Sequence, residues 1–207
     1  MSEPNAKLFV FAAPSGAGKT TLVHAVVSKH PYLRFSISYT TRPQRRNEAH
    51  GVDYMFVDKK TFESLREQGE MLESATVFDN LYGTSRTQVE EHLSEGNSVV
   101  LEIDWQGARQ VRESMPECVT IFILPPSHDE LVRRLRDRRT DSDEVITRRL
   151  RDAESDMSHW DEFDFVVIND DLDKAVTDLE AILAGRGDDQ ATSNAALRST
   201  VAAIVDL

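Results

Sequence analysis

The segment that most constrains the fold is the string Ala-Pro-Ser-Gly-Ala-Gly-Lys-Thr at positions 13–20. Glycines at 16 and 18 let the backbone curl so that successive N–H groups converge on an anion. A helix that begins there directs its positive end to the same point. Lys19 adds a mobile positive charge for the outer phosphates, and the Thr20 hydroxyl suits a Mg²⁺ ion that bridges them. The string predicts a strand, a phosphate-binding loop and a helix, in that order.

The flanking residues support this interpretation over that of a glycine-containing loop that happens to end in Lys-Thr. Residues 8–12 are typical of a buried strand and residues 21–27 of a helix. Ala13 stands where the pattern G-x-x-x-x-G-K-[ST] has glycine, so we expect Ala13 to avoid a positive φ. The residues expected to contact a nucleoside triphosphate are Ala13, Pro14, Ser15, Gly16, Ala17, Gly18, Lys19, Thr20 and Thr21.

Composition narrows the function classes. The 207 residues, 40% hydrophobic and 29% charged, suit one soluble globular domain. The first residues lack the basic start and long apolar stretch of a secretory signal, and no run is long enough to span a membrane. The single cysteine, Cys118, excludes an intrachain disulfide and suits a reducing cytoplasm. A net charge of −12 argues against a nucleic-acid partner, because the overall field repels polyphosphate.

Any anionic ligand must therefore meet local basic groups, and arginines do cluster. The clusters comprise Arg42, Arg45 and Arg46; Arg133, Arg134, Arg136, Arg138 and Arg139; and Arg148, Arg149 and Arg151. For the second cluster, a solvated helix face is the alternative, because Asp137 and Asp141 are interleaved with it.

Strand-like runs at 8–12, 33–38, 98–103, 119–124 and 165–168 alternate with helix-like segments, which predicts a parallel sheet covered on both faces. Ser85-x-x-Gln88 and Ser127-x-x-Glu130 are capping-box patterns that mark helix starts. We expect an α/β three-layer sandwich with a core at 7–39, 85–130 and 158–185. A small lobe of short strands and one helix, at 40–84, interrupts it. Residues 131–157 form a helical lid charged on most sides, and 186–207 a polar linker followed by an amphipathic helix.

Several further sequence strings resemble motifs of the guanylate kinase family, and they occur in the same order as in that family. They lie at residues 36–43, 51–54, 82–85, 104–107 and 169–171, and the resemblance spans residues 7–183. It implies a P-loop fold with a GMP-binding lobe and a lid. It also implies an enzyme that transfers the γ-phosphoryl group of ATP to GMP, with Mg²⁺ as cofactor and ATP and GMP as its small-molecule partners.

A guanine ring offers two neighbouring N–H donors that one carboxylate accepts together. By resemblance, Glu73 fills that role, with Asp104, Ser38 and Thr84 as further base contacts. The GMP phosphate is assigned to Arg42, Arg45, Tyr54 and Tyr82. A surface acid is the alternative for Glu73, and core aromatics with exposed hydroxyls are the alternative for the two tyrosines.

On the ATP side, Arg134 and Arg138 lie four residues apart on one helix face, so both can approach the same phosphates. Resemblance adds Arg149 and assigns Asn169 to the adenine. The sequence departs from the family pattern at Arg139, where the family usually has glycine. The expected catalytic set is Lys19, Arg42, Arg134, Arg138 and Arg149. Glu102 and Asp104 share one face of a strand, and Glu102, where the family usually has aspartate, is expected with Thr20 in the metal shell.

Two other functions remain open at this stage. One is an interaction module that keeps the fold without catalysis; the intact Lys19 and Thr20 argue against it. The other is a kinase for a different small phosphate acceptor. Glu73 with Ser38 argues against that function, because a sugar phosphate would leave the carboxylate unpaired.

Overall fold

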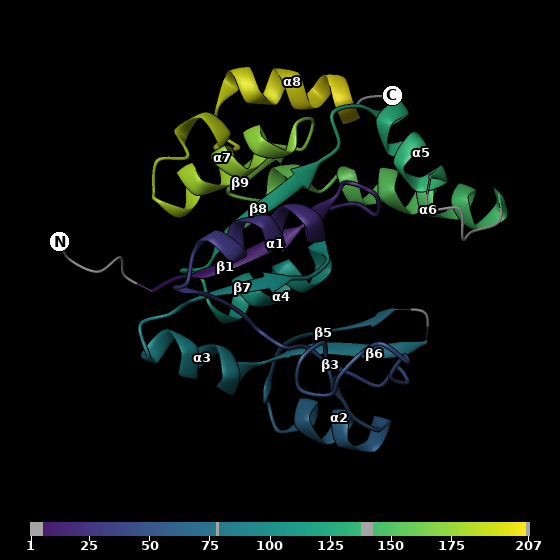
Figure 1. Cartoon of the computed structure of the whole chain (residues 1–207), viewed down its shortest axis with the longest axis vertical. Helices are drawn as coiled ribbons and strands as arrows, with labels where there is room; N and C mark the ends of the chain where they lie inside the picture. Colours follow the sequence, from purple (N-terminus) through teal and green to yellow (C-terminus); the bar gives the residue numbers. More distant parts are fainter. Residues whose placement is uncertain (1–5, 78, 138–142, 206–207) are drawn as a thin grey trace. The chain divides into compact units, whose positions relative to one another are not determined.

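The computed structural model describes residues 6–77, 79–137 and 143–205. Its larger sheet has five strands: β1 (Leu8–Ala12), β2 (Leu33–Phe35), β7 (Ser98–Glu102), β8 (Val119–Leu124) and β9 (Phe165–Ile168). Their order is β2-β7-β1-β8-β9, and β2 pairs with β7, and β8 with β9, in parallel (Figure 1). Every residue of β1 is buried. The predicted α/β fold with a central parallel sheet is confirmed.

Helices follow the strands, and polar side chains cap many of their N-termini. The helices of this sheet and of the C-terminal part are α1 (Lys19–Lys29), α3 (Arg86–Ser94), α4 (Trp105–Ser114), α5 (His128–Arg136), α6 (Asp143–Met157), α7 (Leu172–Leu183) and α8 (Ala195–Val205). The Ser85 side chain accepts from the Gln88 N–H, and the Ser127 side chain accepts from the Glu130 N–H. Both predicted helix starts are therefore correct.

A second, smaller sheet is mixed. Its strands are β3 (Tyr39–Thr40), β4 (Met55–Phe56), β5 (Met71–Val77) and β6 (Asn80–Ser85), in the order β4-β3-β6-β5. The β3–β4 pair is parallel, whereas β3–β6 and β5–β6 are antiparallel. Helix α2 (Lys59–Glu67) completes this part, with Phe62 fully buried. The prediction of short strands and one helix is confirmed.

Among the described residues, the chain divides into two compact units. The first is made of Pro31–Val119 with the residues up to Val10, and the second of Phe11–His30 with the residues from Thr120 onward. The mixed sheet and α4 belong to the first unit. The phosphate loop and α5 to α8 belong to the second. No helix in the described part of the chain is long and apolar enough to cross a membrane.

Two sequence-based expectations need correction. Helices α5 and α6, which were expected to be charged on most sides, each have a face that packs into the core. Leu131 and Leu135 of α5 and Ala153 and Met157 of α6 are buried. Their apolar residues recur at helical spacing, which dense charge obscures in the sequence. The supposed linker after Arg186 is also structured, since it contains a short 3₁₀ turn, Asp188–Gln190, and Ala191 bridges to Phe165 of β9.

Candidate active site

The phosphate loop has the backbone that the glycine positions predict. Gly16 and Gly18 have φ values of +94° and +87°, and α1 begins immediately afterwards at Lys19. Asp79 is the only non-glycine residue with a positive φ in the described ranges, so the expectation for Ala13 is confirmed. A cavity of about 350 Å³ lies against the loop. It is lined by Ala13, Pro14, Ser15, Gly16, Gly18, Lys19, Thr20, Thr21 and Asp156.

Ala17 does not line this cavity but is buried beneath it, where its carbonyl is held from two sides. The Asn169 amide donates to the Ala17 oxygen at 2.8 Å, and the Arg134 guanidinium donates to the same oxygen at 3.2 Å. Arg134 also donates to the Asn169 carbonyl at 2.9 Å. A methyl group at Gly18 would lie 2.5 Å from the Asn169 amide nitrogen. Two side chains predicted to meet ATP, those of Arg134 and Asn169, therefore brace the predicted phosphate loop.

The other residues predicted for the ATP side lie on α5 and α6 or outside the described residues. Glu130 accepts hydrogen bonds from Arg133 and Arg134 at 2.6 Å and 2.7 Å. These bonds lower the pKa of Glu130 to about 2, and the bond from Arg133 has the larger effect. Arg149 lies partly buried on α6. Arg138 and Arg139 lie outside the described residues. Asp156, near the end of α6, was missed because nothing in the local sequence connects it with the loop.

In the first unit, the predicted base-reading acids come together. A register shift in β5 between Met71 and Glu73 places Glu73 opposite Thr84, and bulges of this kind re-aim a side chain. Glu73 is only 4% exposed, and the Thr84 hydroxyl donates to its Oε1 at 2.7 Å. The alternative of a surface acid is therefore wrong. Asp104 caps α4, with the Gly107 N–H donating to its Oδ1 at 2.7 Å.

The close packing of Gly107 against Glu73 and Asp104 explains why this position is a glycine. A methyl group there would lie 3.0 Å from Glu73 Oε2 and 3.3 Å from Asp104 Oδ1. The pKa of Glu73 is raised to about 7, because burial raises it more than the Thr84 hydrogen bond lowers it, and the negative charge of Asp104 adds to the rise. Glu73 therefore takes up or releases its proton near neutral pH.

The residues predicted for the GMP phosphate also share one region. Arg42 lies 5.4 Å from the centre of the Tyr54 ring, and the Tyr54 and Tyr82 rings meet edge to face at 6.0 Å. The missed partner is Glu48, which accepts from both ends of the Arg42 guanidinium at 2.7 Å and 3.0 Å. These bonds lower the pKa of Glu48 and raise that of Arg42. Glu48 follows the arginine cluster in the same loop, which was the available signal.

The remaining predicted residues are less closely engaged in the described contacts. Arg45 is exposed, and its backbone N–H donates to Glu48 Oε2 at 2.8 Å. Ser38 is partly buried, and its carbonyl accepts from the Met55 N–H at 2.9 Å. Glu102 ends β7, two residues before Asp104, as expected.

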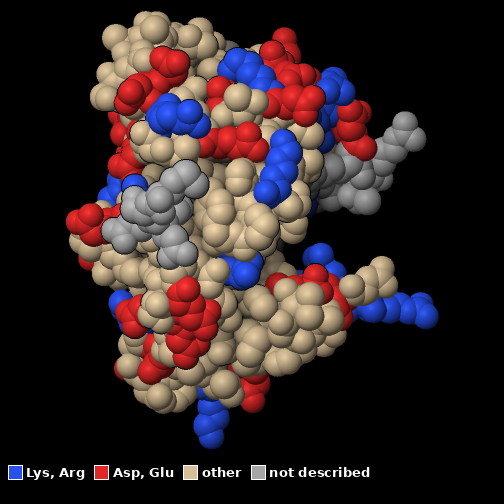
Figure 2. Space-filling model, turned by 60° about the vertical axis from the view of Figure 1, so that its left-hand side comes forward, with Lys and Arg blue, Asp and Glu red and all other residues tan. Residues whose placement is uncertain are grey.

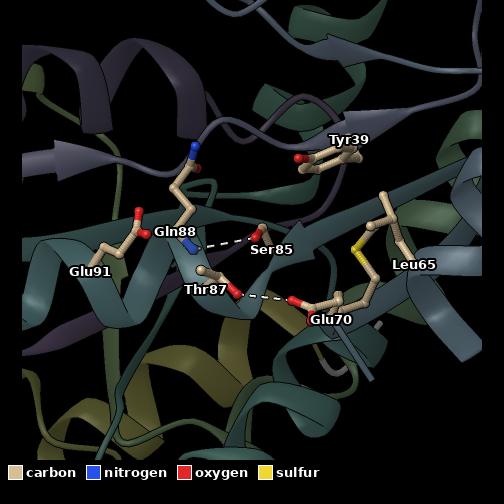
Figure 3. Close-up of a pocket in the computed structure, with 8 residues that line it drawn as sticks. Tyr39, Leu65, Glu70, Ser85, Thr87, Gln88 and Glu91 are labelled. Atoms are coloured by element: carbon tan, nitrogen blue, oxygen red, sulfur yellow. Dashed lines mark hydrogen bonds between the residues drawn. The ribbon is translucent and has the colours of Figure 1, made fainter. Parts of the chain in front are cut away.

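A second cavity of the first unit, about 360 Å³, is separate from these residues (Figure 3). Tyr39 pairs with Gly83, whereas Thr84 pairs with Glu73, and successive residues of a strand face opposite sides of a sheet. Tyr39 and Ser85 therefore line the side of the mixed sheet opposite Thr84. Thr87 donates to Glu70 at 2.9 Å in this cavity.

A glycine-formed phosphate loop on a parallel α/β sheet, with a small mixed sheet elsewhere in the chain, is the arrangement of P-loop nucleoside monophosphate kinases. The family model for guanylate kinase matches residues 5–186. The chain belongs to the guanylate kinase family.

Relatives and a solved structure agree with this membership. A guanylate kinase of Alkalilimnicola ehrlichii is 55% identical over 84% of this chain and 86% of its own. One of Methylococcus capsulatus is 55% identical over 85% of this chain and 86% of its own. The crystal structure of guanylate kinase from Anaplasma phagocytophilum is 33% identical, with a TM-score of 0.69, and the match covers 95% of this chain and 94% of that one.

Proposed function

We infer that the chain transfers the γ-phosphoryl group of ATP to GMP, giving ADP and GDP, and serves GMP recycling and purine nucleotide metabolism in the cytoplasm. The observation that carries this inference is the buried Glu73 beside the partly buried Asp104, in a chain that also has a phosphate loop. A buried carboxylate is costly without a partner, and the N–H donors of guanine supply one.

The base site selects guanine by its hydrogen-bond pattern. Glu73 accepts from two neighbouring guanine N–H groups, Asp104 accepts a further bond, and Ser38 and Thr84 complete the contacts. Adenine places an acceptor where guanine has a donor, so its lone pair would face the Glu73 carboxylate. Such a mismatch supports discrimination of several powers of ten.

The GMP phosphate is held by Arg42, Arg45, Tyr54 and Tyr82. Arg42 is already oriented, because Glu48 binds both ends of its guanidinium and the Tyr54 ring lies beneath it. A planar guanidinium fixed in this way meets a phosphate with less loss of side-chain entropy than a free one.

ATP binds through the phosphate loop, with its outer phosphates at Lys19 and its adenine near Asn169. Thr20 lines the loop cavity, and a hydroxyl oxygen is a ligand type that fits a Mg²⁺ ion. Thr20 would hold the ion, and Glu102 would contact its hydration shell. When bound, Mg²⁺ neutralises charge on the β- and γ-phosphates.

The chain's own residues align the substrates and stabilise charge, which is most of what phosphoryl transfer requires. A GMP phosphate oxygen attacks the γ-phosphorus in line with the departing ADP oxygen. Lys19, Arg134, Arg138 and Arg149 stabilise charge on the transferring group, and Arg42 holds the acceptor. No general base is needed, because a phosphate monoester with a second pKa of about 6 is already largely ionised at neutral pH.

The expected partners are the small molecules ATP and GMP, without nucleic acid or membrane. Charge supports this, since the net value is −12. Acidic and basic side chains are also mixed over the described surface that Figure 2 shows. Phosphate binding then depends on the local arginines and the loop.

A coupled ADP-release assay with GMP, AMP, CMP and UMP tests this function. We expect kcat/KM for GMP to exceed that for AMP by about 10³-fold or more. Lys19→Ala should lower turnover at least about a hundredfold and leave GMP affinity unchanged, because Lys19 lies in the phosphate loop and not in the mixed sheet. Absence of turnover in the unmodified chain would favour an interaction module, and preference for another nucleotide would refute the base assignment.

A further inference from the structure

The side chain of Gln110, on α4, pairs with the backbone of β5 next to Glu73. Its Oε1 accepts from the Ser74 N–H at 3.0 Å, and its Nε2 donates to the Ser74 carbonyl at 3.2 Å. Both backbone groups of Ser74 are satisfied by one amide, as they would be by a neighbouring strand. None of the strings that resemble the guanylate kinase family includes Gln110.

The position of Ser74 makes this pairing consequential. β5 is an edge strand of the mixed sheet, and β6 is its one neighbour among the described strands. Ser74 is the residue directly after Glu73, which follows the register shift in β5. An edge strand with an irregular register has few bonds that fix where its side chains point. Gln110 supplies two such bonds at the point where the orientation of Glu73 is set.

The same helix carries the other acid of the base site. Asp104 caps α4, and Gly107 is packed against both Asp104 and Glu73. Gln110 follows Gly107 by three residues and so lies on the same side of the helix. α4 therefore reaches β5 at two points, through the small Gly107 and through the Gln110 amide.

We propose that Gln110 is a positioning residue for guanine recognition, tying β5 to α4 so that Glu73 and Asp104 keep the separation that a guanine edge requires. This inference rests on the proposed function, because it concerns the same base site. Gln110 does not touch the nucleotide. It acts through the strand that carries Glu73.

Gln110→Met tests the proposal, because methionine has a similar length and helix propensity but cannot form either bond. We expect the dissociation constant for GMP, measured by calorimetry without ATP, to rise about tenfold. The KM for ATP should stay within twofold. Gln68→Met is the matched control: the exposed Gln68 side chain, at the C-terminal end of α2, donates to the Ser64 hydroxyl at 2.8 Å, so GMP affinity should not change.

Two further measurements separate positioning from a general loss of structure. In a Glu73→Gln background, Gln110→Met should weaken GMP binding by less than twofold, since the group it positions is gone. Burial keeps the pKa of Glu73 near 7, and a loosened β5 admits water. The midpoint of the pH dependence of GMP affinity should therefore move to lower pH in Gln110→Met. The Glu73→Gln profile, which lacks the Glu73 titration, gives the baseline.

The results that overturn the proposal are distinct from those that overturn the function. Unchanged GMP affinity in Gln110→Met, or equal increases in the KM values for GMP and ATP, would reject Gln110 as a positioning residue. If Gln110→Met does not fold, Gln110→Glu keeps the acceptor for the Ser74 N–H. It should weaken GMP binding about threefold, and no change there would reject the proposal equally. Absence of GMP phosphorylation by the unmodified chain would refute the function, whatever Gln110 does.

Discussion

At the scale of single residues, the role proposed for Glu73 in guanine recognition would oppose the stability of the fold. The carboxylate is buried, and burial raises its pKa from 4.5 to about 7. An ionised acceptor in such a place is costly until a ligand brings N–H donors. The empty protein therefore carries a penalty at neutral and alkaline pH that GMP would relieve on binding.

Glu73→Gln should reveal this penalty as a pH-dependent stability. The folded state holds the Glu73 proton more tightly than the unfolded state does. That stabilisation is fully present below pH 4.5 and is lost as pH rises through about 7. Glutamine stays neutral and can still accept from Thr84. At pH 8 we expect the variant's free energy of unfolding to exceed that of the unmodified chain by up to about 3 kcal/mol, at about 1.4 kcal/mol per pKa unit.

Urea unfolding of both proteins between pH 4 and pH 8 measures the difference, which should shrink towards the acid end. The same variant should lose about ten- to a hundredfold in kcat/KM for GMP, because an amide accepts only one of the two guanine donors and leaves a mismatch. If the two proteins were equally stable at all pH values, the environment of Glu73 would not disfavour its charged form.

At the scale of elements, most of the helices and strands could be predicted from local sequence patterns. The phosphate loop, the strands of the larger sheet and the caps at Ser85 and Ser127 depend on residues close together in the chain. The contacts that sequence patterns did not reveal are long-range. Asn169 bonds to Ala17 across 152 positions and Gln110 to Ser74 across 36. The bulge beside Glu73 depends on the register with β6, which no local pattern encodes.

The C-terminal segment is a second element whose packing could not be predicted. Family resemblance ends near residue 183 and the family model at 186, yet the following residues cover the edge strand β9. Ala191 bridges to Phe165, and the Thr192 N–H donates to the Asp164 carbonyl at 2.9 Å. On α8, Val201 is fully buried and Arg198 lies 4.9 Å from the Trp160 ring centre. An uncovered edge strand invites association between chains.

Val201→Asp should therefore lower the thermal stability without altering the chemistry. A buried, unpaired carboxylate at that position should cost about 3 kcal/mol or more. The melting temperature should fall by several degrees, and aggregation on heating should increase. Below the transition, kcat and both KM values should match those of the unmodified chain. Ser199→Asp, on the exposed side of α8, is the control and should be nearly neutral. A loss of kcat in folded Val201→Asp would place the C-terminal segment in the active site.

At the scale of the whole molecule, two anionic substrates must bind a chain of net charge −12. We propose that each unit binds its anionic substrate through local positive groups. The first concentrates Arg42 beside two tyrosines, and the second combines backbone N–H groups with Lys19 at the start of α1. Because the two sets of groups are separate along the chain, each substrate should slow amide hydrogen exchange in a different set of residues.

Hydrogen exchange in four ligand states tests this division and the lid role proposed for the arginine helices. GMP alone should slow amide exchange in the mixed sheet, and a non-hydrolysable ATP analogue alone should slow it in the phosphate loop and α1. If Arg149 meets the ATP phosphates only in the closed, reacting complex, α6 should be protected by both ligands together more than by either alone.

Arg149→Ala should then lower kcat at least about tenfold with GMP affinity unchanged, because a contact made mainly in the reacting complex is expressed in kcat. Arg148→Ala is the matched control, since Arg148 is exposed on the same helix and has no role in the proposed site. A solvated arginine face predicts the opposite pattern: equal exchange of α6 in all four states and two silent substitutions. That pattern would remove α6 from the catalytic cycle and leave charge stabilisation to Lys19 and the residues of α5.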